Sequence, residues 1–207
     1  MRKIIITIII TILLSGCSTT STKETGQNLL DGVSMNWAER LEYYGKIFST
    51  VINGLEANKD NDYFQGLSDG VILSLQTSSL YDQSKTIMIK NLNNYFLEEE
   101  VKLIETILYN LNESTYMLSQ IIYHGEYKKD ELPIERILKF SDQLNATGVS
   151  STTLNFYNLI RNPNAVFKNN SKSDILELIN NLKEDSTDLY DKLYEKREKL
   201  STSNNEN

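Results

Sequence analysis

The residue types that most often carry out chemistry in proteins are scarce in this sequence. His124 is the only histidine among 207 residues, and Cys17 is the only cysteine. A zinc site needs three or four cysteine, histidine or carboxylate ligands, and a di-iron site in a helical bundle needs Glu-x-x-His pairs. The residue three positions before His124 is Ile121, so no such pair exists. We predict no metal ion, no cofactor and no catalytic residue, and we place His124 at a helix end beside Gly125.

Carboxylates are the next candidates for chemistry. Glu98, Glu99 and Glu100 form the densest acidic run, and Glu105 follows closely. Paired carboxylates can bind a divalent cation or act as general acid and base. Successive residues of a helix point about 100° apart, so three adjacent glutamates do not face one another. The run therefore predicts a solvated helix face.

Tyrosine is abundant, with twelve residues, and three of them recur at steps of seven: Tyr109, Tyr116 and Tyr123. This spacing places them on one flank of a helix. Tyrosine offers a large rigid ring with a polar tip, which suits protein interfaces and stacking on sugars. The rings either widen the flank of the core, which is the commoner arrangement, or form a partner-binding surface. Two further pairs admit the same two interpretations: Tyr43 with Tyr44, and Tyr190 with Tyr194.

Cys17 lies where an apolar run ends and a hydroxyl-rich run begins. The chain starts with the basic pair Arg2 and Lys3, continues with an apolar stretch over residues 4–14, and then has small residues before the cysteine. Eleven helical residues rise only about 16 Å, which is roughly half the thickness of a bilayer core. The order of these features is that of an export signal that is removed.

The quartet Leu14, Ser15, Gly16 and Cys17 resembles the lipobox of bacterial lipoprotein precursors. The resemblance implies that the Cys17 thiol receives a diacylglyceryl group and that a signal peptidase cuts between Gly16 and Cys17. Two or three acyl chains then hold a protein stably on a membrane. In that family an Asp after the cysteine retains the protein at the inner membrane. Ser18 stands there, which favours the outer membrane, or the outer face of the cell membrane where only one membrane exists.

The charge balance excludes one class of partner. Twenty-one Lys and Arg residues face 28 Asp and Glu residues, for a formal net charge of −7, and loss of Arg2 and Lys3 with the signal takes it to −9. Nucleic acid is not an expected partner, because phosphate binding needs a basic surface. Residues 18–32 are polar and show no helical apolar period, so we predict a flexible tether.

The rest of the chain is dominated by helical spacing, with no clear period-2 strand. Ser34 is placed to cap a first helix, and a second helix is expected from about Asp60. A long pattern from Tyr81 to His124 is expected to break, if anywhere, at residues 110–115, because Asn and Ser compete for backbone hydrogen bonds. Residues that are apolar except for Thr115 and Ser186 recur at alternating steps of 4 and 3 in three stretches. These seams are Trp37, Leu41, Tyr44, Phe48, Val51 and Leu55; Leu97, Val101, Ile104, Leu108, Leu111, Thr115, Leu118 and Ile122; and Ile175, Ile179, Leu182, Ser186, Leu189 and Leu193.

Between the last two seams, Pro133 suits the first turn of a helix that carries Ile134, Ile137, Leu138 and Leu144. A shorter helix over residues 151–161 is expected to end before Pro163, and residues 162–172 to form a polar loop. The last helix starts near Ser173. One apolar stripe per helix predicts an all-α fold, an elongated antiparallel bundle of about five to six helices. A second chain could instead complete the seams, so the oligomeric state stays open.

The chain is therefore expected to comprise a cleaved signal peptide (1–16), a lipidated cysteine with a flexible tether (17–32), a helical domain (33–200) and a disordered tail (201–207). We predict a lipid-anchored envelope protein that acts as a non-enzymatic binding or scaffolding module. Its expected partner is another envelope protein or a cell-wall polymer. Two alternatives stay open: a carrier of a small apolar ligand in the bundle core, and an envelope enzyme.

Overall fold

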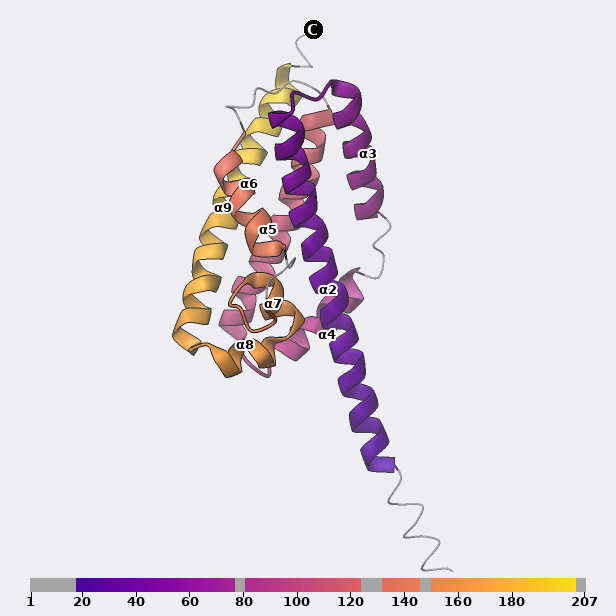
Figure 1. The fold of residues 1–207 in the computed structure, drawn as a ribbon, viewed down its shortest axis with the longest axis vertical. Helices are drawn as coiled ribbons and strands as arrows, with labels where there is room; N and C mark the ends of the chain where they lie inside the picture. The colour runs from indigo at the N-terminus through magenta and orange to yellow at the C-terminus, as the bar shows by residue number, and fades with distance from the viewer. Residues whose placement is uncertain (1–17, 77–80, 124–131, 146–149, 204–207) are drawn as a thin grey trace, which may run out of the picture.

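The computed structural model describes residues 18–76, 81–123, 132–145 and 150–203 (Figure 1). These residues form eight α-helices packed as a bundle, with no strand among them, so the predicted all-α helical bundle is confirmed. The helices are α2 (Ser18–Glu56), α3 (Asn61–Gln76), α4 (Tyr81–Leu92), α5 (Glu98–Tyr123), α6 (Ile134–Leu144), α7 (Phe156–Arg161), α8 (Pro163–Asn169) and α9 (Lys172–Ser203).

The three long helices, α2, α5 and α9, run in the same direction, and the shorter helices carry the chain back between them (Figure 1). At the start of α5 and α9, Lys172 Nζ lies 3.1 Å from Glu100 Oε1. Further along both helices, Asn110 Nδ2 donates to Ser186 Oγ at 3.2 Å. Residue numbers increase in the same direction along both helices, so α5 and α9 are parallel neighbours. The segments that return the chain, α3 with α4 and α6 with α7 and α8, run in the opposite direction (Figure 1).

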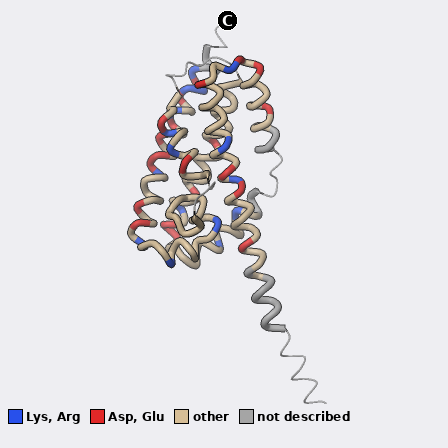
Figure 2. Tube along the Cα trace, in the orientation of Figure 1, with Lys and Arg blue, Asp and Glu red and all other residues tan. Residues whose placement is uncertain are grey.

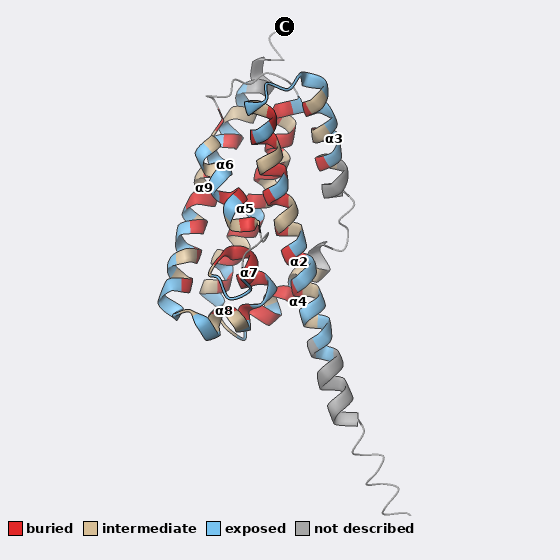
Figure 3. Cartoon of the chain, viewed as in Figure 1, coloured by how far each residue is buried: buried red, intermediate tan, exposed pale blue. Residues whose placement is uncertain are grey.

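The predicted seams form the core, with the exception of Leu97, which is 57% exposed just before α5, and Leu55, which is partly buried. Figure 3 shows the buried positions on the sides of the helices that face into the bundle. Burying each large apolar side chain contributes about 1.5–3 kcal/mol, so these stripes hold the bundle together. On α6 the prediction was less successful, because Ile137 and Leu144 are buried but Leu138 is 41% exposed.

A close approach between α2 and α6 requires Gly45. A Cβ atom at this position would lie 3.0 Å from Leu144 Cβ, and Ser141 Oγ donates to the Gly45 carbonyl oxygen at 3.2 Å. The hydrogen bond and the missing side chain together let the two backbones lie side by side.

The long element breaks at residues 93–97, not at residues 110–115, so the position predicted for the break was wrong. Asn110 and Asn112 remain helical because their side chains find partners on other helices: Ser186 and Thr187 for Asn110, and Tyr44 and Arg40 for Asn112. Thr115 Oγ1 donates to the Leu111 carbonyl oxygen at 2.7 Å. The new helix begins after Leu97, whose N–H donates to Glu100 Oε2 at 2.8 Å in the manner of a capping box.

The loop predicted over residues 162–172 contains a helix, α8. The Asn162 side chain caps it by accepting from the Ala165 N–H at 3.2 Å, and Pro163 occupies the first helical position, where its missing N–H costs nothing. Val166 is fully buried, and Phe167 packs on Tyr95 with ring centroids 5.5 Å apart. Phe167 also contacts the Phe96 ring at a centroid distance of 5.1 Å, and these two aromatic contacts fold a segment whose polar composition indicates a loop.

Residues 18–32 also differ from the prediction, because α2 is helical from Ser18 onward. Nucleation is the costly step of helix formation, and the packed seam from Trp37 onward nucleates α2. Extending the helix toward Ser18 therefore costs little free energy. Ser34 lies inside α2 rather than at its cap, and its buried hydroxyl accepts from Asn91 Nδ2 at 3.3 Å. We call residues 18–32 the stalk. It projects beyond the bundle (Figure 1) and is about 22 Å long at 1.5 Å per residue.

The end of the chain follows the prediction in part. α9 continues to Ser203, so residues 201–203 of the expected tail are helical, and residues 204–207 lie outside the described residues. Acidic and basic residues are interspersed along the helices (Figure 2).

Candidate binding surfaces

An aromatic surface lies where α5 and α9 meet. The ring centroids of Tyr109 and Tyr190 are 6.2 Å apart, and those of Tyr190 and Tyr194 are 6.1 Å apart with their planes 18° from parallel. The guanidinium carbon of Arg197 lies 5.1 Å from the centroid of Tyr194. We call Tyr109, Tyr190 and Tyr194 the tyrosine ladder. Tyr109 is 53% and Tyr194 41% exposed, so the ladder presents ring area to the solvent.

The ladder differs from the stripe expected along α5. Of the three residues predicted there, Tyr109 and Tyr123 are exposed, whereas Tyr116 is half-buried and its hydroxyl accepts from Gln120 Nε2 at 3.1 Å. The rings that Tyr109 contacts come from α9. Within α9 the signal was present in the sequence, because Tyr190, Tyr194 and Arg197 follow one another at steps of four and three.

Tyr190, the middle residue of the tyrosine ladder, stays protonated at neutral pH. Burial raises the pKa of the Tyr190 hydroxyl, and the neighbouring Tyr109 hydroxyl raises it further. A protonated phenol can both donate and accept a hydrogen bond, so the ladder offers polar tips as well as apolar ring area. Arg197 adds one cation at the end of the row and stacks over Tyr194.

The predicted pair of Tyr43 and Tyr44 is structural rather than exposed. Tyr44 is fully buried, and its hydroxyl donates to Asn112 Oδ1 at 2.8 Å and accepts from Arg40 Nε at 2.6 Å. Burial raises the pKa of Tyr44 to about 12, although the nearby Arg40 opposes the shift. This network joins α2 to α5 and leaves Tyr44 no surface for a partner. Tyr43 is half-buried against the core.

The acidic run at the start of α5 contains ion pairs. Glu98 pairs with Lys102 at 3.0 Å and Glu100 pairs with Lys172 at 3.1 Å. Glu98 and Glu99 are exposed, as a solvated helix face requires. Among the described residues, no group of three or more His, Cys, Asp and Glu side chains is arranged to hold a metal ion.

Leu14, Ser15, Gly16, Cys17 and His124 lie outside the described residues. Residues 1–18 match the family model of the prokaryotic membrane lipoprotein lipid attachment site. The chain is the precursor of a bacterial membrane lipoprotein. No curated protein and no solved structure matches the lipoprotein. Within the described ranges, none of the helices combines the length and the hydropathy that crossing a bilayer requires.

A polar pocket lies at the end of the lipoprotein's bundle that adjoins the stalk. It has a volume of about 550 Å³, which is within the range of small-molecule sites. It is bounded by the first buried turn of α2, the end of α4 with the turn that follows, and the junction of α7 and α8. Its lining residues are Asp31, Ser34, Met35, Asn91, Tyr95, Ser151, Arg161, Asn162, Pro163 and Asn164. No local sequence pattern indicates this site, because three distant segments build it.

Proposed function

We propose that the mature lipoprotein is a non-enzymatic binding module that holds another envelope component at the tyrosine ladder. The lipid attachment site supports anchorage to a membrane through Cys17. The observation that carries the binding role is the row formed by Tyr109, Tyr190 and Tyr194, which ends at Arg197. Tyr and Arg are the residue types enriched where binding energy concentrates in interfaces.

The exposed rings motivate this assignment in energetic terms. Tyr109 and Tyr194 expose about half of their surface in the free protein, and Tyr190 lies between them already half-buried. A flat partner that covers the row gains the burial of two large rings, while the stacked arrangement has already restricted their rotation. Little side-chain entropy is lost on binding, which favours affinity.

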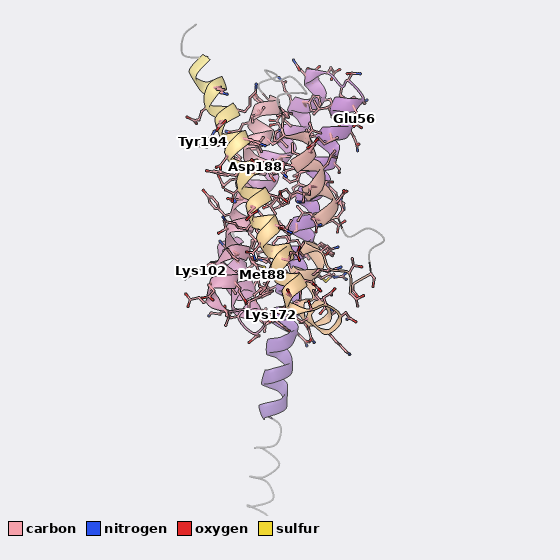
Figure 4. All side chains as sticks on the ribbon, turned by 90° about the vertical axis from the view of Figure 1, so that its left-hand side faces the viewer. Glu56, Met88, Lys102, Lys172, Asp188 and Tyr194 are labelled. Carbon is pink, nitrogen blue, oxygen red and sulfur yellow. The ribbon has the colours of Figure 1, made fainter. Side chains whose placement is uncertain are left out.

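The position of the ladder suits a partner away from the membrane. The stalk enters the bundle at one end, and α9 runs from Lys172 near that end to Tyr194 near the other (Figure 4). The mature chain has a net charge of −9, so anionic headgroups repel the body of the domain. We infer a partner in the space beyond the membrane surface, either a protein or a cell-wall polymer, and we favour the outer membrane because Ser18 follows Cys17.

The test is crosslinking of the lipoprotein to its partner in intact cells. We expect Tyr109→Ala combined with Tyr194→Ala to lower recovery of the crosslinked partner by about tenfold or more, the size typical of central interface residues. Tyr123→Ala is the matched control, because Tyr123 is 44% exposed on α5 and is not one of the three ladder residues. It should leave recovery unchanged.

Two outcomes contradict the proposal. Undiminished recovery with the ladder variant, at an unchanged circular dichroism spectrum and melting temperature, removes the ladder as the binding surface. The second outcome is a partner that is recovered with a bond cleaved or formed only when the lipoprotein is present. That result refutes a non-enzymatic role and favours the alternative that the lipoprotein is an envelope enzyme.

A further inference from the structure

We propose that the polar pocket at the stalk end of the bundle binds a polyhydroxylated ring that carries one anionic group, as in an acidic sugar. This site is separate from the tyrosine ladder, so the inference does not depend on the proposed partner. Three segments that are distant in sequence contribute to it: residues 31–35, residues 91–95 and residues 151–164.

The loop over residues 150–155, which contributes Ser151 to the pocket lining, is held in place by side-chain hydrogen bonds. Asn158 is 3% exposed, and its Nδ2 atom donates to the carbonyl oxygens of Ser150 and Thr153 at 2.9 Å each. Asn170 Nδ2 donates to the Thr152 carbonyl oxygen at 3.2 Å. Two amide side chains are thus used to hold one loop in one conformation. A prearranged wall is what a specific small-molecule site requires.

Buried polar side chains also line the pocket. Asn91 is 7% and Ser34 2% exposed, and Asn91 Nδ2 donates to Ser34 Oγ at 3.3 Å. Placing an amide and a hydroxyl in these positions costs free energy that apolar residues would not cost. Their presence beside a cavity fits a ligand rich in hydroxyl groups, because amide and hydroxyl groups both donate and accept.

Tyr95 supplies an aromatic wall. Its ring stacks on Phe167 of α8, with centroids 5.5 Å apart and planes 25° from parallel, while the residue also lines the pocket. The stacking on Phe167 holds the Tyr95 ring in place. The apolar face of a sugar packs on such a surface, as it does on aromatic rings generally.

The charged residues of the lining set the charge of the ligand. Arg161 is exposed, and its guanidinium carbon lies 5.9 Å from the centroid of the Tyr157 ring. A guanidinium presents paired donors that match a carboxylate or a phosphate. Asp31 lines the same pocket and can accept from ring hydroxyls. One cation and one anion among the lining residues suit a ligand with a single negative group and disfavour a polyanion.

Two sources could present this chemistry at the stalk end of the lipoprotein: a cell-wall sugar, or the headgroup of an inositol phospholipid. The test titrates the mature lipoprotein, purified in detergent, by calorimetry with two charged probes, N-acetylmuramic acid and glycerophosphoinositol. Their uncharged counterparts are N-acetylglucosamine and inositol. We expect at least one charged probe to bind about tenfold or more tightly than its counterpart, because a charge-assisted hydrogen bond contributes that much. Binding of the first indicates a wall sugar, and binding of the second indicates a lipid headgroup.

Three variants locate the binding. Arg161→Gln should abolish the preference for the charged probe, and Asn164→Trp, which fills the pocket from an exposed position, should abolish binding of either member of the pair. Lys168→Gln removes an exposed cation of α8 that is not among the lining residues and should leave affinity unchanged. Failure of both charged probes to bind at millimolar concentration overturns the proposal, as does binding that survives Arg161→Gln and Asn164→Trp. Unchanged binding by the tyrosine-ladder variant separates this result from that of the proposed function.

Discussion

Asp185 provides the strongest test of how the bundle is held together. It is 8% exposed on α9 and accepts from two cations of α6: Arg136 Nη1 at 2.9 Å, and Lys139 Nζ. Arg136 Nε also donates to Asp188 Oδ2 at 2.8 Å. The side chains of Arg136 and Lys139 are 41% and 46% exposed, so water can solvate both if the carboxylate is lost.

This geometry fixes the expected loss for Asp185→Asn. Breaking a fully buried pair costs about 3–5 kcal/mol, but the two half-exposed cations regain hydration, which reduces the loss to about 2 kcal/mol. The amide keeps the size of the carboxylate, so a packing defect does not contribute. For a domain of this size, a loss of about 2 kcal/mol lowers the melting temperature by about 4–8 °C.

The measurement is thermal and urea unfolding followed by circular dichroism. Asp191→Asn, at an exposed position of the same helix, is the control and should change stability by less than about 0.5 kcal/mol. A double-mutant cycle with Arg136→Gln should give a coupling free energy above about 0.5 kcal/mol. Equal stability of the two asparagine variants, or additive effects in the cycle, refutes the conclusion that this ion cluster fastens α6 to α9.

Three further predictions follow from other contacts. Gly54→Ala should destabilise the fold by about 1–3 kcal/mol, because the new Cβ would lie 2.7 Å from Tyr63 Cε1. Gly66→Ala is the control and should be neutral or stabilising, because a Cβ there meets no atom within 4 Å. Equal urea midpoints for the two variants would contradict this prediction. Tyr44→Phe should cost about 1–2 kcal/mol in urea unfolding, because Arg40 and Asn112 lose their shared partner, and no loss would show that the network is dispensable. The hydrogen bond that Asp188 accepts from Lys192, followed by the one from Arg136, lowers the pKa of Asp188. The contribution of the ionised Asp188 to folding stability is therefore complete above the ordinary pKa of 3.8 and is lost as the pH falls through the lowered pKa. Stability measured against pH should therefore fall less steeply below pH 4 in Asp188→Asn than in the wild type, and parallel curves would contradict the shift.

The sequence predicted best what repeats along a helix. Five of the six seam residues from Trp37 to Leu55, and all six from Ile175 to Leu193, are buried. An apolar stripe must be covered by a neighbour whatever the topology, so its burial follows from spacing alone. The 100° step between successive helical residues likewise predicted the exposure of Glu98 and Glu99, whereas Glu100 pairs with Lys172 of α9.

The prediction failed where distant segments determine local structure. Residues 110–115 have weak helix propensity, but Asn110 is satisfied by side chains of α9 and Asn112 by Tyr44, contacts that local propensity cannot contain. The α8 segment is polar in composition and folds because Phe167 packs against Tyr95. Only part of the tyrosine ladder could be predicted. The spacing along α5 identified Tyr109, but its contact with Tyr190 depends on α5 and α9 being parallel neighbours, which local sequence does not contain.

The helical stalk changes what the lipid anchor can do. A flexible tether would let the bundle rotate freely at the membrane, whereas a stalk that continues into α2 fixes which end of the bundle faces the anchor. The polar pocket includes Asp31 of the stalk, whereas Tyr194 lies toward the opposite end of the bundle (Figure 4). Gly26 and Gly32 are the weakest points of this rod, since glycine costs about 1 kcal/mol relative to alanine inside a helix and a Cβ at either position would meet no atom within 4 Å. If the two proposed assignments hold, stiffness at these two residues determines how strictly the pocket is kept apart from the tyrosine ladder.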